Sequence, residues 1–242
     1  MALQLYLDLN SQPCRSVYIF VKKNNIQFEF KQIQLSIGQQ HSEEFRRINP
    51  LRKVPAIKDG DFSLAESVAI LKYLALKYQT PDHWYPADLQ KRARVDEYLA
   101  WQHTALRPHA GKIFMLKGML PILTGEPVSE DRVKEARDDL TQSLKSFEEK
   151  FLQDKPYIAG DEISLADLVA VVELMQPLAV GFDPLEGSAT LTAWRSRVKT
   201  AIGTELFDET HQPILNAVET LKSMSQTGAL QTFKTNFLKN YK

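Results

Sequence analysis

Ser11 stands between a short alternating stretch, residues 3–8, and a helical pattern that begins near Pro13. Free N–H groups and the macrodipole at a helix N-terminus favour anions, so a hydroxyl at this place can hold a thiolate by donating a hydrogen bond. Lowering a thiol pKa from about 8.5 by roughly two pH units takes about 3 kcal/mol. A charge-assisted hydrogen bond supplies roughly 1.5–3 kcal/mol, and the helix terminus adds roughly 0.3–1 kcal/mol. Ser11 therefore suits thiolate stabilisation without a base or a metal, although simple helix capping accounts for a serine here equally well.

Cys14 is a competing nucleophile, because Ser11-Gln-Pro-Cys14 has the spacing of a thioredoxin-like Cys-x-x-Cys motif. In that motif the first cysteine attacks, and here its position is serine. Cys14 lies one turn inside the helix, where we interpret it as a buried, inert thiol. As the single cysteine of the chain it also excludes an internal disulfide and a cysteine-rich metal site. The five histidines show no metal-ligand spacing, so we expect no metal.

Val54 and Pro55 open a short predicted strand. A cis bond between them would turn the backbone of Val54 toward a cleft, where its N–H and C=O could pair with a bound peptide as with an added strand. A trans proline that starts an edge strand is an equally open interpretation.

The segment Ser63-Leu-Ala-Glu66-Ser67 also has two interpretations. Ser63 and Glu66 match a capping box, or Ser67 is itself the cap. Alternatively, a carboxylate and a hydroxyl at a helix start can bind the ammonium and carboxylate of an amino-acid end group. Lys53 and His41 could hold a second carboxylate.

Composition indicates a globular protein whose partners are small molecules or proteins. Apolar residues make up 43% and charged residues 25% of the 242 residues. Lysine plus arginine equals aspartate plus glutamate at 30 each, which gives no long-range attraction to nucleic acid or to acidic membranes. The sequence has no run of eighteen apolar residues that could span a membrane, and its first residues lack the basic region and long apolar core of a signal peptide. We therefore expect a cytoplasmic protein without nucleic-acid or membrane partners.

The first half of the chain alternates strands and helices. Strands are expected at residues 3–8, 27–35, 54–58 and 61–64, with Asp59-Gly60 as a hairpin turn between the last two. The stretch 27–35 alternates almost perfectly, which is typical of a half-buried strand. Helices are expected after Ser11, around residues 43–48 and over residues 66–78. The order β-α-β-α-β-β-α predicts a compact mixed sheet whose first two strands are parallel.

The second half carries no convincing strand. A helix can run over residues 89–117, where Pro108 predicts a kink or a break. Ser164 and Asp167 form a capping-box pattern, across which Ile163 and Leu168 have the spacing of a hydrophobic staple. Further helices are expected over residues 133–153, 191–202, 205–221 and 231–239. The expected architecture is a small α/β domain, residues 1–80, followed by an all-helical domain, residues 88–242.

Several motifs together resemble theta-class glutathione transferases. They are Leu-Asp-Leu-Asn-Ser11-Gln-Pro-Cys-Arg, Asn49-Pro-Leu-Arg-Lys-Val-Pro55, Leu64-Ala-Glu-Ser-Val-Ala-Ile-Leu71, Arg92-Ala-Arg-Val-Asp-Glu-Tyr-Leu-Ala-Trp-Gln-His103 and Ile163-Ser-Leu-Ala-Asp-Leu168. The similarity extends with fading strength to about residue 220. It implies a thioredoxin-like N-terminal domain, an all-helical C-terminal domain, a homodimer, and glutathione as cosubstrate with no bound cofactor.

The resemblance also implies roles for individual residues. Ser11 would be the thiolate stabiliser, Val54 would bind the cysteine backbone of glutathione beside a cis Pro55, and Lys53 would hold the glycine end. The γ-glutamyl end would be held by Glu66 and Ser67.

One departure from the family concerns the glycine end. The family often has histidine directly after Gly-Gln, whereas here Gly38-Gln39 is followed by Gln40, with His41 one place later. Gln40 can still donate a hydrogen bond to the glycine carboxylate, but it brings no positive charge. Either glutathione affinity is modestly lower or His41 substitutes, and both possibilities stay open.

The second substrate would be a small electrophile bound between the domains near Ser11. Arg107 would point into that pocket and stabilise developing negative charge, and a C-terminal helix with Phe233, Lys234 and Phe237 would cover it. Halide displacement and hydroperoxide reduction both fit a thiolate nucleophile. A carrier or assembly module without turnover is the alternative function, and a disulfide oxidoreductase acting through Cys14 is a third.

Overall fold

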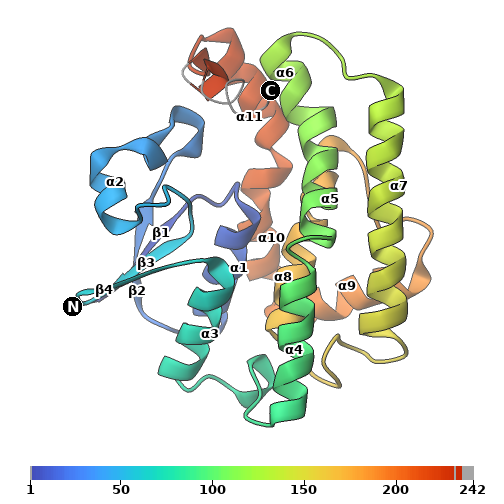
Figure 1. The fold of residues 1–242 in the computed structure, drawn as a ribbon. Coiled ribbons are helices and arrows are strands. Elements are labelled where there is room, and N and C mark those ends of the chain that lie inside the picture. The colour runs from blue at the N-terminus through green and yellow to red at the C-terminus, as the bar shows by residue number, and fades with distance from the viewer. Residues whose placement is uncertain (1, 232, 236–242) are drawn as a thin grey trace.

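A computed structural model describes residues 2–231 and 233–235 of the chain. Its N-terminal part is built on a four-stranded sheet in the order β2-β1-β3-β4 (Figure 1). The strands are β1 (Leu3–Leu7), β2 (Phe28–Gln32), β3 (Ala56–Asp59) and β4 (Phe62–Ala65). β1 and β2 are parallel, while β3 is antiparallel to both β1 and β4. The predicted mixed sheet is confirmed.

Helices cover both faces of this sheet. α1 (Gln12–Lys23) packs against α3 (Ser67–Lys77), and both contribute to the core that also contains the alternate β1 residues Leu5 and Leu7. The side chain of Tyr6 lies on the other face, where it packs with Phe45 of α2 (Glu43–Ile48). Two 3₁₀ turns, η1 (Leu35–Ile37) and η2 (Gln39–His41), lead from β2 into α2. The alternation of β1 therefore reflects one strand covered by helices on both sides.

The prediction of a half-buried strand over residues 27–35 is wrong in length and in burial. β2 is five residues long and lies at the edge of the sheet, and its Phe30 is 39% exposed. Tyr18 of α1 contacts the ring of Phe30 edge-on, with ring centroids 6.0 Å apart. An edge strand can alternate in sequence without having a fully covered face, because it has a neighbour on one side only.

The C-terminal part is helical. Its elements are α4 (Leu89–Trp101), α5 (Leu106–Phe114), the π-helical turn η4 (Met115–Met119), α6 (Leu120–Thr124), α7 (Glu130–Ser146), the π-helical turn η5 (Phe147–Leu152), α8 (Leu165–Leu174), the 3₁₀ turn η6 (Pro177–Val180), α9 (Ala189–Ile202), α10 (Thr204–Leu215) and α11 (Ala217–Gln226). A 3₁₀ turn, η3 (Asp82–Trp84), stands in the connection from α3 to α4. Among the described residues of this part, β pairing is limited to an isolated bridge between Tyr157 and Gly160. The chain is therefore an α/β domain followed by an all-helical domain, as predicted.

Two predicted helices are interrupted, one of them ahead of the expected break and the other where no break was expected. The helix over residues 89–117 breaks between Trp101 and Leu106, ahead of Pro108. Pro108 is the third residue of α5, where a backbone N–H has no intrahelical partner to lose. The helix predicted over residues 205–221 is two helices, α10 and α11, which meet at Asn216 three residues after Pro213. Of the helix predicted over residues 231–239, residues 231 and 233–235 are helical and the others lie outside the described residues.

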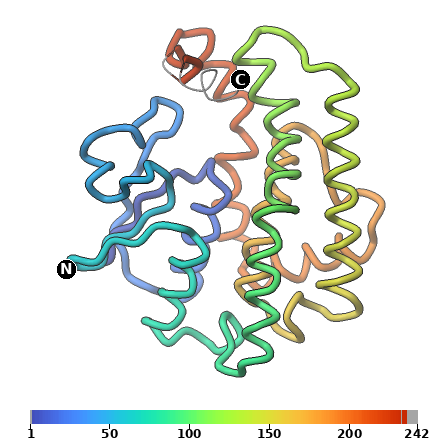
Figure 2. Tube along the Cα trace, in the orientation of Figure 1, coloured from blue at the N-terminus to red at the C-terminus, as the bar shows by residue number. Residues whose placement is uncertain are grey.

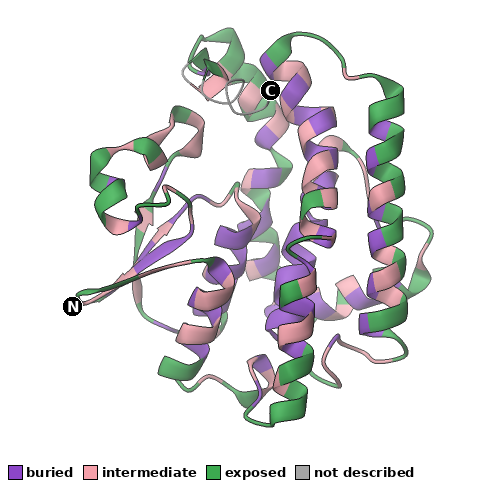
Figure 3. Ribbon diagram, in the orientation of Figure 1, coloured by how far each residue is buried: buried purple, intermediate pink, exposed green. Residues whose placement is uncertain are grey.

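The two parts share one hydrophobic core. α1 packs against α8 and α10 as well as against α3, so it lies between the sheet and the helical bundle (Figure 2). One cluster of buried side chains runs from Leu5 of β1 through Val17 of α1 to Leu168 of α8 and Trp194 of α9. Burial is densest along α1 and α8, while the outer face of α7 is exposed (Figure 3).

The predicted capping box at the start of α8 is confirmed. The Asp167 carboxylate accepts hydrogen bonds from the backbone N–H of Ser164 (3.0 Å), the Ser164 hydroxyl (2.9 Å), the backbone N–H of Ile158 (2.9 Å) and the indole N–H of Trp194 (3.0 Å). All of these groups are buried. Asp167 thus joins the loop before α8 to α9 as well as capping α8.

Candidate active site

Ser11 occupies the N-cap position of α1, in extended backbone with φ −87° and ψ 124°. Its backbone N–H donates to the carbonyl of Asp8 (2.9 Å), and its carbonyl accepts from the N–H groups of Cys14 and Arg15 (both 3.1 Å). Its side chain makes no capping hydrogen bond. The hydroxyl is therefore not used in capping the helix, which removes the capping interpretation, and Ser11 lines a cavity instead.

Asp8 fixes the turn that carries Ser11. One carboxylate oxygen accepts the backbone N–H of Asn10 (2.9 Å), and the other accepts the backbone N–H of Leu35 in η1 (3.0 Å). The turn after β1 and the loop after β2 are thus tied together by one carboxylate. Because β1 and β2 are parallel, their C-terminal ends lie side by side and both loops leave the sheet at that end.

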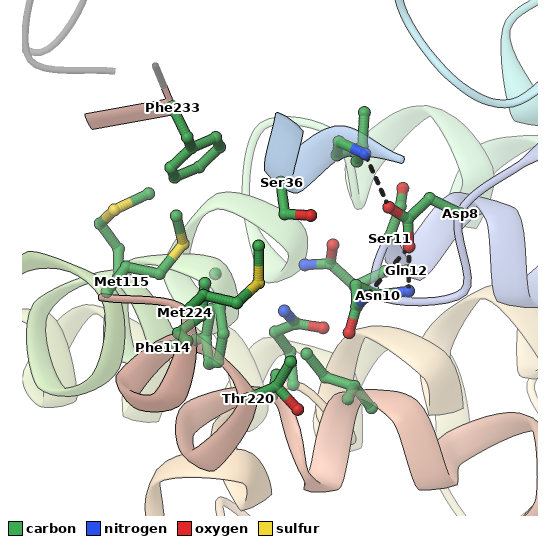
Figure 4. A pocket seen from close by; sticks show the side chains of 17 residues that line it. Asp8, Asn10, Ser11, Gln12, Ser36, Phe114, Met115, Thr220, Met224 and Phe233 are labelled. Atoms are coloured by element: carbon green, nitrogen blue, oxygen red, sulfur yellow. Dashed lines mark hydrogen bonds between the residues drawn. The ribbon is translucent and has the colours of Figure 1, made fainter. Parts of the chain in front are cut away.

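The cavity beside Ser11 has a volume of about 410 Å³ and lies between the two parts of the chain. It is lined by Asp8, Asn10, Ser11, Gln12, Leu35, Ser36, Gly111, Phe114, Met115, Met119, Gln176, Ile214, Ala217, Thr220, Leu221, Met224 and Phe233. Figure 4 shows the polar side chains of the β1–α1 turn on one side and Phe114, Met115, Met224 and Phe233 on the other. A molecule in this cavity would have an apolar body and present its reactive atom to Ser11.

Cys14 is fully buried in α1. Burial raises the pKa of its thiol to about 12, against the opposing effects of hydrogen bonds to Asp8 and Ser11. The thiolate is the reactive form of cysteine, so this residue carries almost no nucleophile at neutral pH. The interpretation of Cys14 as an inert thiol is supported, and a disulfide oxidoreductase acting through it is disfavoured.

The strand register brings the other candidate loops to the end of the sheet where Ser11 lies, next to the C-terminal end of β1. Ala56 pairs with Tyr6 near the end of β1 and with Ala65 at the end of β4. Val54 and Pro55 directly precede Ala56, and Glu66 directly follows Ala65. The Val54–Pro55 peptide bond is cis, which decides between the two interpretations of this proline.

Glu66 has a positive φ of 67° at the N-cap of α3, and its side chain makes no capping hydrogen bond. The capping-box interpretation of Ser63 and Glu66 is therefore wrong, because Ser63 lies within β4 and Glu66 leaves the helix end uncapped. Ser67 is not the cap either, since it is the first residue of α3. The Glu66 side chain is exposed. Burial and Arg107 lower the pKa of His103 in the helical part, and the negative charge of Glu66 opposes that shift.

The residues expected at the glycine end of glutathione lie in η2 and before β3. The amide nitrogen of Gln40 lies 3.4 Å from Nε2 of His41, and its amide oxygen is buried without a hydrogen-bond partner among the described residues. Lys53 is exposed, and its carbonyl accepts a hydrogen bond from Asn49 (2.8 Å).

Only some of the residues expected around the electrophile line the cavity. Phe233 lines the cavity, whereas Arg107 and Lys234 are not among its described lining residues. Nε of Arg107 lies 3.6 Å from the buried Glu173 carboxylate. Phe237 lies outside the described residues. Most of the wall could not be predicted from the sequence: it comes from α5, η4, α10 and α11, together with the pocket residue Gln176. The signal available was the Phe-Met-Leu-Lys-Gly-Met run from Phe114, an apolar segment beyond the expected kink.

The part of the chain that the structure describes contains neither a metal site nor a membrane-spanning helix. No cluster of three or more His, Cys, Asp or Glu side chains there could hold a metal ion. No helix in that part of the chain is both long and apolar enough to cross a membrane.

A thioredoxin-like domain that carries a hydroxyl at the first helix terminus, followed by an all-helical domain, is the architecture of a glutathione transferase. Residues 1–76 match the model of the glutathione S-transferase N-terminal domain, and residues 107–200 match that of the C-terminal domain. Glutathione S-transferase theta-1 of Bos taurus is 56% identical over 217 residues, covering 90% of each chain, and the Homo sapiens theta-1 enzyme is 55% identical with the same coverage.

Solved structures agree with these relatives. Human glutathione S-transferase T1-1 in its apo form superposes with a TM-score of 0.88 at 51% identity, covering 95% of this chain and 99% of that one. Human glutathione transferase theta-2 in complex with glutathione and an unknown ligand superposes with a TM-score of 0.87 at 49% identity, covering 91% and 90%. The chain belongs to the theta class of the glutathione S-transferase family. It is accordingly a transferase with glutathione as cosubstrate.

Proposed function

We propose that this chain transfers the glutathione sulfur to small apolar electrophiles, with the Ser11 hydroxyl donating a hydrogen bond to the thiolate. The observation that carries the proposal is the Ser11 side chain, which makes no capping bond and lines the 410 Å³ cavity. The sulfur attacks an electrophilic carbon, and a halide leaves with the electron pair of the broken bond. With a hydroperoxide, the sulfur attacks the terminal oxygen, an alcohol leaves, and a second glutathione converts the sulfenic acid to disulfide and water.

The proposed glutathione site lies along the end of the sheet next to Ser11. The backbone of Val54 beside the cis Pro55 would pair with the cysteine backbone, as with an added strand. Lys53 would hold the glycine carboxylate together with Gln40 or His41. The amide nitrogen of Gln40, the group that can donate to a carboxylate, lies 3.4 Å from Nε2 of His41, so the glycine carboxylate could bind either side chain at the same place.

Glu66 and Ser67 would hold the γ-glutamyl end. Replacing Glu66 by alanine should raise the dissociation constant of glutathione by about tenfold or more, because a charge-assisted hydrogen bond to the ammonium is lost. Turnover at saturating glutathione should change little. Calorimetric titration measures the constant, and Asp61→Ala, an exposed acid in the hairpin before Glu66, is the control. An unaltered constant would remove Glu66 from the site.

The electrophile is proposed to fill the cavity against Phe114, Met115, Met224 and Phe233. These soft, polarisable side chains favour an apolar body. Nε of Arg107 lies 3.6 Å from the Glu173 carboxylate, which is a loose contact. We propose that Arg107 and Lys234 are the cations that approach the leaving group once the cavity is occupied.

The experiment that tests the proposed function is an ultraviolet titration of the thiolate of bound glutathione against pH. A thiol pKa well below the solution value, together with turnover of an alkyl halide, is the expected result. Binding with an unshifted pKa would favour a carrier module, and absence of binding would contradict the proposed site.

We further propose a homodimer that acts in the cytoplasm. Phe62 of β4, Leu76 of α3 and Leu89 of α4 are 47%, 56% and 78% exposed, and a second copy would stabilise the assembly by covering such apolar side chains. Light scattering that gave the mass of one chain would contradict the dimer, and cell fractionation tests the compartment.

A further inference from the structure

Arg15 is a fully buried cation directly beneath the turn that carries Ser11. Its Nη1 donates to the carbonyls of Leu9 (2.9 Å) and Asn10 (3.1 Å), the two residues that precede Ser11. Its Nη2 donates to the carbonyl of Val172 (3.2 Å) and to the side-chain oxygen of Gln176 (2.8 Å), which lie in and just after α8. One guanidinium thus joins the β1–α1 turn to the helical domain.

The surroundings of Arg15 keep it charged. Burial lowers the pKa of the guanidinium to about 10, opposed by the carboxylates of Glu173 and Asp8, so it stays protonated at neutral pH. His211 of α10 faces it as a neutral imidazole, since burial and Arg15 lower its pKa to about 3.

Glu173 of α8 is the buried carboxylate that faces Arg15. Burial raises the pKa of Glu173 to about 7, opposed by the positive charges of Arg107 and Arg15. Neither of its oxygens has a hydrogen-bond partner among the described residues. Its effect on Arg15 is therefore electrostatic, whereas the contacts of Arg15 with the turn are hydrogen bonds of fixed geometry.

We propose that Arg15 is a positioning residue for the transfer reaction, which holds the Leu9–Ser11 segment against α8 so that the Ser11 hydroxyl points to the glutathione sulfur. This inference rests on the proposed function of Ser11. Arg15 does not line the cavity among its described residues, so it acts through the backbone of the turn and through Gln176, which does line it. A planar fork with two donors on each side can bridge two backbone segments in a way that an ammonium cannot.

The test compares two variants of the full-length protein. Arg15→Lys keeps the charge but loses the fork, and we expect turnover at saturating substrates to fall about tenfold or more, because small displacements of a positioned group are costly. The pKa of bound glutathione should rise toward its solution value. Glutathione affinity should stay within about threefold, since Val54 and Glu66 are untouched.

Glu173→Gln keeps the four hydrogen bonds of Arg15 and removes a buried negative charge. Thermal stability should fall because the buried Arg15 loses the negative charge that faces it, yet the pKa of bound glutathione should stay unchanged or fall. Arg195→Lys, which breaks a two-bond pair with Asp183 (both 2.9 Å) on α9, is the control for loss of a guanidinium fork away from the site.

Two results would overturn the inference. One is an Arg15→Lys protein, folded by circular dichroism, with the turnover and thiol pKa of the unchanged protein. The other is a rise of the thiol pKa in Glu173→Gln equal to that in Arg15→Lys, which would mean that both changes act through general destabilisation. A normal thiol pKa in the unchanged protein would instead reject the proposed function of Ser11.

Discussion

Replacing Ser11 by alanine is expected to lower turnover by roughly two to three orders of magnitude, as does the loss of one preorganised hydrogen-bond donor in other enzymes. Glutathione binding should be largely retained, because the proposed contacts with Val54 and Glu66 remain. The turn itself should keep its shape, since it is held by the backbone bond from Ser11 to Asp8 and by the bonds of Arg15. Steady-state kinetics with an alkyl halide and the ultraviolet titration of bound glutathione measure the two effects.

Cys14→Ala is the matched control for Ser11→Ala. It removes the single thiol of the chain one turn further along α1, and transfer should survive because that thiol is buried. Unchanged turnover in Ser11→Ala would exclude Ser11 from the mechanism. Loss of transfer in a folded Cys14→Ala protein would mean that the thiol takes part in the reaction, either as the nucleophile or through its hydrogen bond with Ser11.

The largest expected effect on stability follows from replacing Asp167 by alanine. Four buried donors from Ile158, Ser164 and Trp194 lose their acceptor at once. Buried donors left unsatisfied cost roughly 1–3 kcal/mol each, and partial relaxation makes a total of about 4 kcal/mol reasonable. For a chain of this size that corresponds to a melting temperature lower by roughly 10 °C.

Calorimetry or denaturant titration measures the loss in Asp167→Ala. Asp161→Ala removes an exposed carboxylate from the same loop and should change stability by less than about 0.5 kcal/mol. A melting temperature of Asp167→Ala close to that of the control would mean that the loop and α9 do not depend on this carboxylate.

The fold could be predicted because its signals are local. The hairpin turn at Asp59-Gly60, the capping box at Ser164 and the helix start after Ser11 are all written in a few neighbouring residues. Burial of β2 could not be predicted, because the alternation of a strand does not tell whether it lies at an edge or in the middle of a sheet. The side-chain role of Ser11 was equally undecided, since an N-cap serine and a thiolate donor look alike in sequence.

The candidate site was predictable where it follows the sheet and unpredictable where it is formed by helix packing. Val54 and Glu66 adjoin β3 and β4, and the register of these strands with β1 places both residues at the same end of the sheet as Ser11. Gln176, Thr220 and Met224 line the same cavity as Ser11 only through the packing of α11 and of the segment after α8, and no short motif marks them. Arg15 stood within the recognised Ser-Gln-Pro-Cys-Arg segment, yet its partners Val172 and Gln176 are more than 150 residues away.

The continuous core across α1 and α8 has a consequence for recombination between family members. A chimaera that takes its thioredoxin-like half from one transferase and its helical half from another would bring together apolar surfaces that were not shaped for each other. The seam includes Val17 from one half, Leu168 from the other, and the guanidinium fork of Arg15 across the junction. Viable exchanges should therefore place the crossover elsewhere or transfer α1 together with α8. The segments that must come from one parent are those that pack across the junction, not the whole domain.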